Sequence, residues 1–163
     1  SDTGVTLEDH VIDLLEERNL TLVTAEVGSG GALAASLNHA EGAKRIYTGG
    51  YVAPSARDMA EILRFDPGLA AEDPEYEKNM TLAIARRLCE NNGNQWSVAI
   101  SQILEGEGGN RFVWMVYGSP KAEFAVESVG MRDSGKTAQA RLVDRALDLL
   151  RRQLKTAPPL PKP

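Results

Sequence analysis

Residues 20–39, Leu-Thr-Leu-Val-Thr-Ala-Glu-Val-Gly-Ser-Gly-Gly-Ala-Leu-Ala-Ala-Ser-Leu-Asn-His, decide how this chain is expected to fold. Residues 20–25 alternate Thr and Val with Leu, which predicts a strand. Residues 32–39 are rich in Ala, which predicts a short helix. The loop between them, Gly28-Ser29-Gly30-Gly31, leads directly from one to the other. Strands that alternate with helices indicate an α/β fold.

The same alternation continues on both sides of this unit. Helices are predicted over residues 6–19, 55–63, 73–91 and 137–154, and strands over residues 47–52, 96–104, 112–117 and 122–129. Thr6 with Asp9 resembles a capping box, and Asp73 before Pro74 is typical of a helix start. The last two strands are joined by residues 118–121 and predict an antiparallel hairpin. We therefore expect an α/β class fold, a layered α/β/α domain with a mixed sheet.

Composition narrows the class of protein. The 163 residues predict one domain over residues 1–156, and residues 157–163 predict a disordered, proline-rich tail. The net charge of -5 argues against nucleic acid or an anionic membrane as a partner. The single cysteine excludes an intrachain disulfide, and no apolar run approaches the ~20 residues of a membrane span. Without a recognisable signal peptide, the chain is expected to be soluble and cytoplasmic. As a separate expectation, it forms a homo-oligomer.

Three stretches resemble signatures of the CinA C-terminal domain family. Residues 24–31, Thr-Ala-Glu-Val-Gly-Ser-Gly-Gly, are similar to T-A-E-S-C-T-G-G. Residues 41–52 are similar to P-G-A-S-x-x-F-x-G-G-x-V, and residues 98–109 lie where the family has A-x-T-G-I-A-G-P-x-G-G. The motifs occur in the family's order and spacing, so the resemblance extends over about residues 7–154.

The resemblance implies a chemistry and also shows departures from it. The family includes enzymes that hydrolyse the amide of nicotinamide mononucleotide to nicotinic acid mononucleotide and ammonia. The family's serine and the cysteine after it fall at Val27 and Gly28, and its tyrosine and lysine fall at Pro54 and Met59. Hydrolysis by a serine needs a nucleophile and a base, and Val and Met supply neither. The resemblance therefore implies a CinA-like domain whose amidohydrolase activity is impaired or absent.

Ser29 is the candidate for a replacement nucleophile. It lies two residues after the family's serine, but neither His10 nor His39 is placed by the sequence as its base. Three hypotheses stay open. The domain binds a small phosphorylated nucleotide without catalysis, or it is an active amidohydrolase with rearranged groups, or it is a structural or assembly domain without a ligand.

The predicted ligand site collects the residues that keep the family's loops. These residues are Thr24, Glu26, Gly28, Ser29, Gly30, Gly31, Ser55, Ser101, Gly108 and Gly109. Backbone N–H groups in a glycine loop at a helix start favour a phosphate. The alternative is a tight turn in which glycine tolerates positive φ. Ser29 is expected to be exposed, so that Ser29→Ala barely changes stability. No cofactor or metal is expected, because Glu105 and Glu107 are typical of a solvated turn.

A second phosphate-binding motif competes with this interpretation. Residues 130–137, Gly-Met-Arg-Asp-Ser-Gly-Lys-Thr, match the P-loop pattern G-x-x-x-x-G-K-[ST]. Only 26 residues follow Thr137, and they predict one helix and the proline-rich tail. A P-loop enzyme needs later strands to carry its magnesium-binding acid. We therefore expect no nucleoside triphosphatase activity.

Overall fold

The computed structural model describes residues 5–161, so the start of the predicted domain and the last two residues of the predicted tail lie outside it. Six α-helices are described within that range: α1 (Leu7–Glu17), α2 (Ala32–Asn38), α3 (Ala43–Ile46), α4 (Ala56–Ile62), α5 (Tyr76–Leu88) and α6 (Gly135–Thr156). The strands are β1 (Thr21–Glu26), β2 (Tyr47–Val52), β3 (Gln95–Ile100), β4 (Leu104–Glu105), β5 (Arg111–Ser119) and β6 (Glu123–Met131), with a 3₁₀ turn, η1 (Glu107–Gly109), between β4 and β5.

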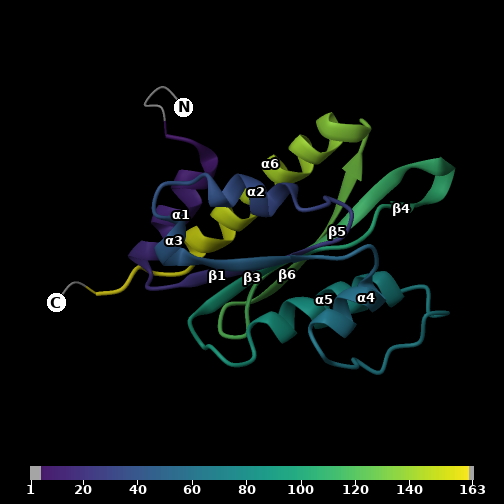
Figure 1. Ribbon diagram of the computed structural model, residues 1–163, viewed down its shortest axis with the longest axis horizontal. Helices are drawn as coiled ribbons and strands as arrows, with labels where there is room; N and C mark the ends of the chain where they lie inside the picture. Colours follow the sequence, from purple (N-terminus) through teal and green to yellow (C-terminus); the bar gives the residue numbers. More distant parts are fainter. Residues whose placement is uncertain (1–4, 162–163) are drawn as a thin grey trace.

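The strands form one mixed sheet in the order β2-β1-β3-β5-β6, with β4 pairing to β5 beyond the end of β3. β1 runs parallel to both β2 and β3, whereas β5 runs antiparallel to β3 and to β6. Helices α1, α2, α3 and α6 lie over one face, and α4 and α5 lie over the other (Figure 1). This arrangement confirms the predicted α/β class and the antiparallel hairpin.

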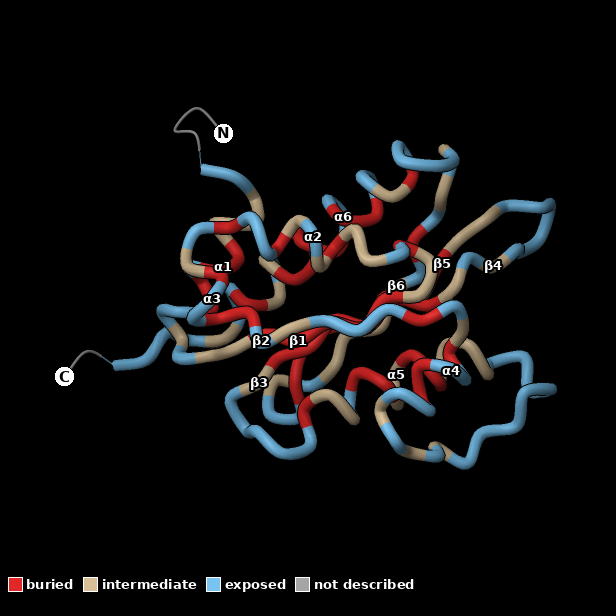
Figure 2. The backbone as a smooth tube through the Cα atoms, viewed as in Figure 1, coloured by how far each residue is buried: buried red, intermediate tan, exposed pale blue. Residues whose placement is uncertain are grey.

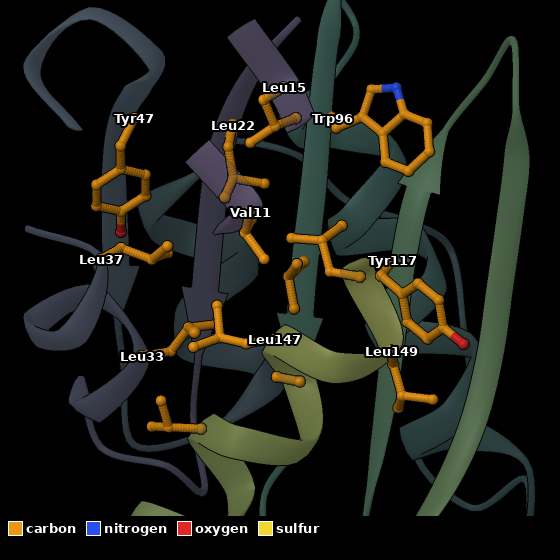
Figure 3. Close-up of a cluster of buried hydrophobic side chains, with 14 of the residues drawn as sticks. Val11, Leu15, Leu22, Leu33, Leu37, Tyr47, Trp96, Tyr117, Leu147 and Leu149 are labelled. Atoms are coloured by element: carbon orange, nitrogen blue, oxygen red, sulfur yellow. The ribbon is translucent and has the colours of Figure 1, made fainter. Parts of the chain in front are cut away.

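Two apolar clusters hold the layers together, and buried backbone follows the middle of the sheet (Figure 2). The larger cluster lies between the sheet and helices α1, α2 and α6 and includes Leu15 and Leu22, which lie next to each other, and Leu147 on α6 (Figure 3). The smaller cluster lies under α4 and α5 and includes Met59 and Val116. Burying a side chain of this size contributes about 1.5–3 kcal/mol, so the two clusters fix how the helices sit on the sheet.

Local signals set the helix starts that were predicted correctly. The Thr6 hydroxyl accepts from the Asp9 N–H at 3.2 Å, and the Asp9 carboxylate accepts from the Thr6 N–H at 3.3 Å, which confirms the capping box.

The prediction that α5 begins at Asp73 is wrong. The Asp73 carboxylate accepts from the Glu75 N–H and its carbonyl accepts from the Tyr76 N–H. Asp73 and Pro74 therefore form a separate turn before the helix.

The strand predicted over residues 96–104 is divided by Ser101. Its hydroxyl accepts from the Trp114 N–H at 2.8 Å, and its carbonyl accepts from the Gly28 N–H at 2.9 Å. The chain therefore leaves the β3 ladder at Ile100 and pairs again with β5 as β4. Helix α3, which the sequence did not signal, occupies part of the connection from α2 to β2.

The described part of the proline-rich segment, residues 157–161, contacts the end of α1. The Arg18 Nε donates to the Ala157 carbonyl at 2.8 Å, and the Leu160 N–H donates to the Glu17 carbonyl at 3.3 Å.

Candidate functional site

Glu26, the last residue of β1, is the carboxylate around which the glycine-rich loop folds. Its side chain is fully buried. Oε1 accepts from the Ser29 hydroxyl at 2.7 Å and from the Leu33 N–H at 2.8 Å, and Oε2 accepts from the Ala34 N–H at 3.0 Å. The first N–H groups of a helix have no partner within it. The Glu26 carboxylate therefore satisfies the start of α2, where the residue before the helix, Gly31, has no side chain to do so.

Ser29 is fully buried, so the expectation that its side chain is exposed is wrong. The cause is the bond to Glu26, which draws the Ser29 hydroxyl inward beneath the loop. His39, one of the two histidines considered as its base, binds the Ala35 carbonyl through Nδ1 at the far end of α2. The proton of the Ser29 hydroxyl is directed at a carboxylate rather than at a histidine.

The glycines of the loop meet two different requirements. Gly30 and Gly31 have φ of 64° and 97°, a region that side chains disfavour, and they turn the chain into α2. Gly28 is required by space, because a Cβ there would lie 2.7 Å from the Ser101 carbonyl oxygen and 3.1 Å from the Ile103 N. The loops that follow β1 and β3 are therefore closed against each other.

Val27 and Met59, at which the resemblance places the serine and the lysine, line the same cavity. Its volume is about 10 Å³, enough for about one water molecule. Met59 is fully buried, and the other lining residues are Ala25, Ala56, Thr81, Ile84, Ala99, Ile100 and Ser101. The fold thus brings the two positions together, although they are 32 residues apart in the sequence, and it surrounds them with mainly apolar side chains.

A family model for the CinA C-terminal domain matches residues 5–154. The chain belongs to this family. A CinA-like protein of Parasynechococcus marenigrum (strain WH8102) is 30% identical over 158 residues, and one of Synechococcus sp. (strain CC9902) is 32% identical over 155 residues. These matches cover 93% and 91% of this chain but only 38% and 37% of the relatives. The chain therefore spans less than two fifths of the length of these curated relatives.

Solved structures of the CinA superfamily share the fold. One from Enterobacter cloacae has a TM-score of 0.76 at 21% identity, with 93% of this chain and 94% of that chain covered. A competence or damage-inducible protein from Enterobacter asburiae has a TM-score of 0.77 at 21% identity, with coverage of 91% and 96%. These two likenesses extend over nearly the whole of each chain and show that the fold is shared.

Other predicted site residues of the CinA-like domain hold the fold locally. The Thr24 and Tyr47 hydroxyls lie 2.6 Å apart inside the protein, and burial raises the pKa of Tyr47. The Ser55 hydroxyl accepts from the Asp58 N–H at 3.1 Å and begins α4. Direct contacts join Glu26 to Ser29 and Gly28 to Ser101, so the structure brings this part of the predicted site together.

Gly108 and Gly109 lie elsewhere, in the exposed arm that runs from β4 to β5 (Figure 1). Glu105 and Glu107 are exposed on the same arm. Across residues 5–161 there is no group of three or more His, Cys, Asp or Glu side chains placed to hold a metal ion. Over the same residues, every helix is too short or too polar to cross a membrane.

The start of α6 is a neighbour of the loop that the sequence analysis did not include. A Cβ on Gly30 would lie 3.0 Å from the Gln139 Nε2, so the first turns of α6 lie against the exposed side of the loop. The P-loop-like segment enters this helix, but Gly130 is paired with Phe112 inside β6. Only residues 132–134 connect β6 to α6, which leaves a short turn in place of a phosphate-wrapping loop. Lys136 and Arg132 of this segment are the sequence signal that could have pointed to this neighbour.

Proposed function

We propose that this CinA-like domain binds a small phosphorylated nucleotide, such as nicotinamide mononucleotide, and does not hydrolyse its amide bond. The observation that carries the second half is the cavity shared by Val27 and Met59. An amidohydrolase with a serine nucleophile needs a hydroxyl and a proton acceptor at bonding distance. Here the two side chains are apolar, and Met59 is part of the smaller core cluster.

The support for binding comes from the exposed side of the loop. Gly30 is exposed and lies against Gln139, while Arg132 and Lys136 flank the start of α6. Neither of these two cations has an ion-pair partner among the described residues. The start of a helix carries partial positive charge, which favours a phosphate. The proposal therefore assigns the phosphate to the start of α6, where Arg132 and Lys136 lie beside Gly30, and leaves Glu26, the Ser29 hydroxyl and the loop N–H groups to their internal bonds.

Calorimetry with nicotinamide mononucleotide tests the binding half. Lys136→Ala removes a charged donor, so we expect a loss of affinity of roughly 10- to 150-fold, equivalent to about 1.5–3 kcal/mol. Lys44→Ala, on the exposed surface of α3, is the matched control and should leave the affinity unchanged. If the wild type binds no mononucleotide at millimolar concentration, this half of the proposal fails.

Ammonia release at saturating nicotinamide mononucleotide tests the other half. We expect no turnover in the range of roughly 1–1,000 per second that is typical of enzymes. Turnover in that range would establish the alternative, an active amidohydrolase with rearranged groups.

The third hypothesis, a structural domain without a ligand, also has one observation in its favour. The N–H groups of Gly28, Gly30, Ala32, Leu33 and Ala34 all donate within the protein. If this hypothesis is correct, the calorimetry shows no heat of binding for any mononucleotide.

A further inference from the structure

The outer edge of β6 is an unpaired sheet edge. Ser101 donates to the Trp114 carbonyl, and the Trp114 N–H donates to the Ser101 hydroxyl, so the backbone polar groups of Trp114 point toward β3. Ser128 is opposite Trp114 in the β5–β6 register. Because N–H and C=O groups alternate in direction along an antiparallel pair, those of Ser128 point away from β5. The same holds for Val126 and Gly130, two residues away on either side.

This edge is open to another strand. Among residues 5–161, no group is hydrogen-bonded to the outward-facing N–H and C=O groups of Val126, Ser128 and Gly130. A Cβ on Gly130 would meet nothing within 4 Å. β6 is nine residues long, and an exposed edge of this length is a template for pairing with another chain.

The face of α6 beside this edge carries charges in a self-complementary order. A groove of about 570 Å³ separates the two elements, and its α6 wall includes Arg141, Asp144, Arg145 and Asp148. A second α6 running antiparallel, with a two-fold axis between residues 144 and 145, would place Arg141 opposite Asp148 and Asp144 opposite Arg145. Arg141 already pairs with Asp133, and Asp148 with Arg151 and Arg152, whereas Asp144 and Arg145 form no ion pair with any residue that the structure describes. The pair between Asp144 and Arg145 of the second copy is therefore the one that carries the charge argument.

The helix and the strand point to the same axis. The midpoint of residues 144 and 145 lies about 10 residues beyond the turn at 132–134, which is roughly 15 Å along α6. The same distance back along β6 is between four and five residues. Counting that many residues back along β6 from the turn leads to residues 127–128. The backbone polar groups of Ser128 face outward there.

We propose that two copies of this chain associate through the free edge of β6, with Ser128 opposite Ser128 of the second copy. This register places Val126 opposite Gly130 of the second copy, where there is open space. A register centred on Glu127 would set two carboxylates directly opposite each other, which is unfavourable. The two six-stranded sheets become one continuous sheet, and the two α6 helices align their opposite charges across the axis.

Sedimentation equilibrium on the full chain tests the interface with four variants and one control variant. Ser128→Pro removes an outward N–H without removing a β5–β6 bond, as proline can do on an edge strand. Asp144→Arg and Arg145→Asp each bring like charges together at two symmetry-related contacts. The double variant restores opposite charges in the reverse order. Lys44→Asp changes an exposed charge on α3 and is the control.

We expect a wild-type dimer that Ser128→Pro dissociates, while its far-ultraviolet circular dichroism is unchanged. Each single charge reversal should weaken the dimer by roughly tenfold, because two contacts change sign. The double variant should return to within about threefold of the wild type, and Lys44→Asp should match it. A wild type that is monomeric at high concentration overturns the proposal. The proposal is also overturned if the wild type is a dimer whose affinity is unchanged by Ser128→Pro and by the charge reversals, because such a dimer would use another face.

Discussion

Replacing Glu26 tests whether the internal carboxylate organises the loop. Glu26→Ala removes the acceptor of three hydrogen bonds, from the Ser29 hydroxyl and from the Leu33 and Ala34 N–H groups. The hydroxyl can rotate toward another acceptor, but the two N–H groups are fixed by α2. A buried donor left without a partner costs about 1–3 kcal/mol.

The two N–H groups together predict a loss of about 2–6 kcal/mol in the free energy of unfolding. That is a large share of the roughly 5–15 kcal/mol that stabilises a typical domain. Glu26→Gln keeps one acceptor oxygen but turns an amide donor toward one of the N–H groups, so about half of that loss is expected. Ser55→Ala, which removes the exposed cap of α4, is the matched control and should cost about 1 kcal/mol.

Urea unfolding followed by circular dichroism measures these differences, because the midpoint shifts while the slope stays constant if only stability changes. We expect the order Glu26→Ala, then Glu26→Gln, then Ser55→Ala, from the largest loss to the smallest. If Glu26→Ala costs no more than Ser55→Ala, the carboxylate does not hold the start of α2 and the reasoning is refuted.

Four further results are expected. Ser29→Ala should lower the free energy of unfolding by about 1.5–3 kcal/mol, since it removes a buried bond to a charged group, and a loss under 0.5 kcal/mol would contradict the burial of this side chain. Met59→Ala should cost about 2–5 kcal/mol in urea unfolding, because it empties space in a packed cluster; a neutral result would mean that the cavity collapses. Bonds from the Glu41 N–H and from Thr6 lower the pKa of Asp9 from 3.8, so its contribution is present above that pH and lost as the pH falls through the lowered value; Asp9→Asn should flatten the acid side of the stability profile, and an unchanged slope would count against it. Lys136→Ala should leave magnesium-dependent ATP hydrolysis at background, as in the wild type, and activity that disappears in the variant would restore the P-loop interpretation.

Local sequence signals predicted most of the fold. The strand–loop–helix unit at residues 20–39, the capping box at Thr6 and the hairpin of β5 and β6 each depend on neighbours in the chain, so their patterns could be recognised. The helix start at Asp73 and the strand through Ser101 were wrong because both depend on a side chain or backbone group that bonds differently in three dimensions.

The site was harder to predict for the same reason. Nothing in the spacing of Glu26 and Ser29 shows that the carboxylate turns inward to satisfy α2, because helix caps are usually supplied by the residue just before the helix. The proximity of Val27 and Met59 could be expected only from the family resemblance, since the loop after β1 and helix α4 meet at this cavity only in the folded chain. The contact of α6 with Gly30 joins residues more than 100 positions apart, so the basic residues before α6 could indicate an anion site but not that it lies beside this loop.

The tight contact at Gly28 limits which side chains the loop can carry. A cysteine, which the resemblance places at this position, cannot be introduced without a backbone shift, because its Cβ would lie 2.7 Å from the Ser101 carbonyl oxygen. The loop after β3 would first have to move and release its bond from the Gly28 N–H. A serine at residue 27 and a lysine at residue 59 would then need space that the apolar cavity does not provide. Building the family's signature into this chain would therefore require several substitutions together, and the loop after β3 would have to move before the new side chains could fit.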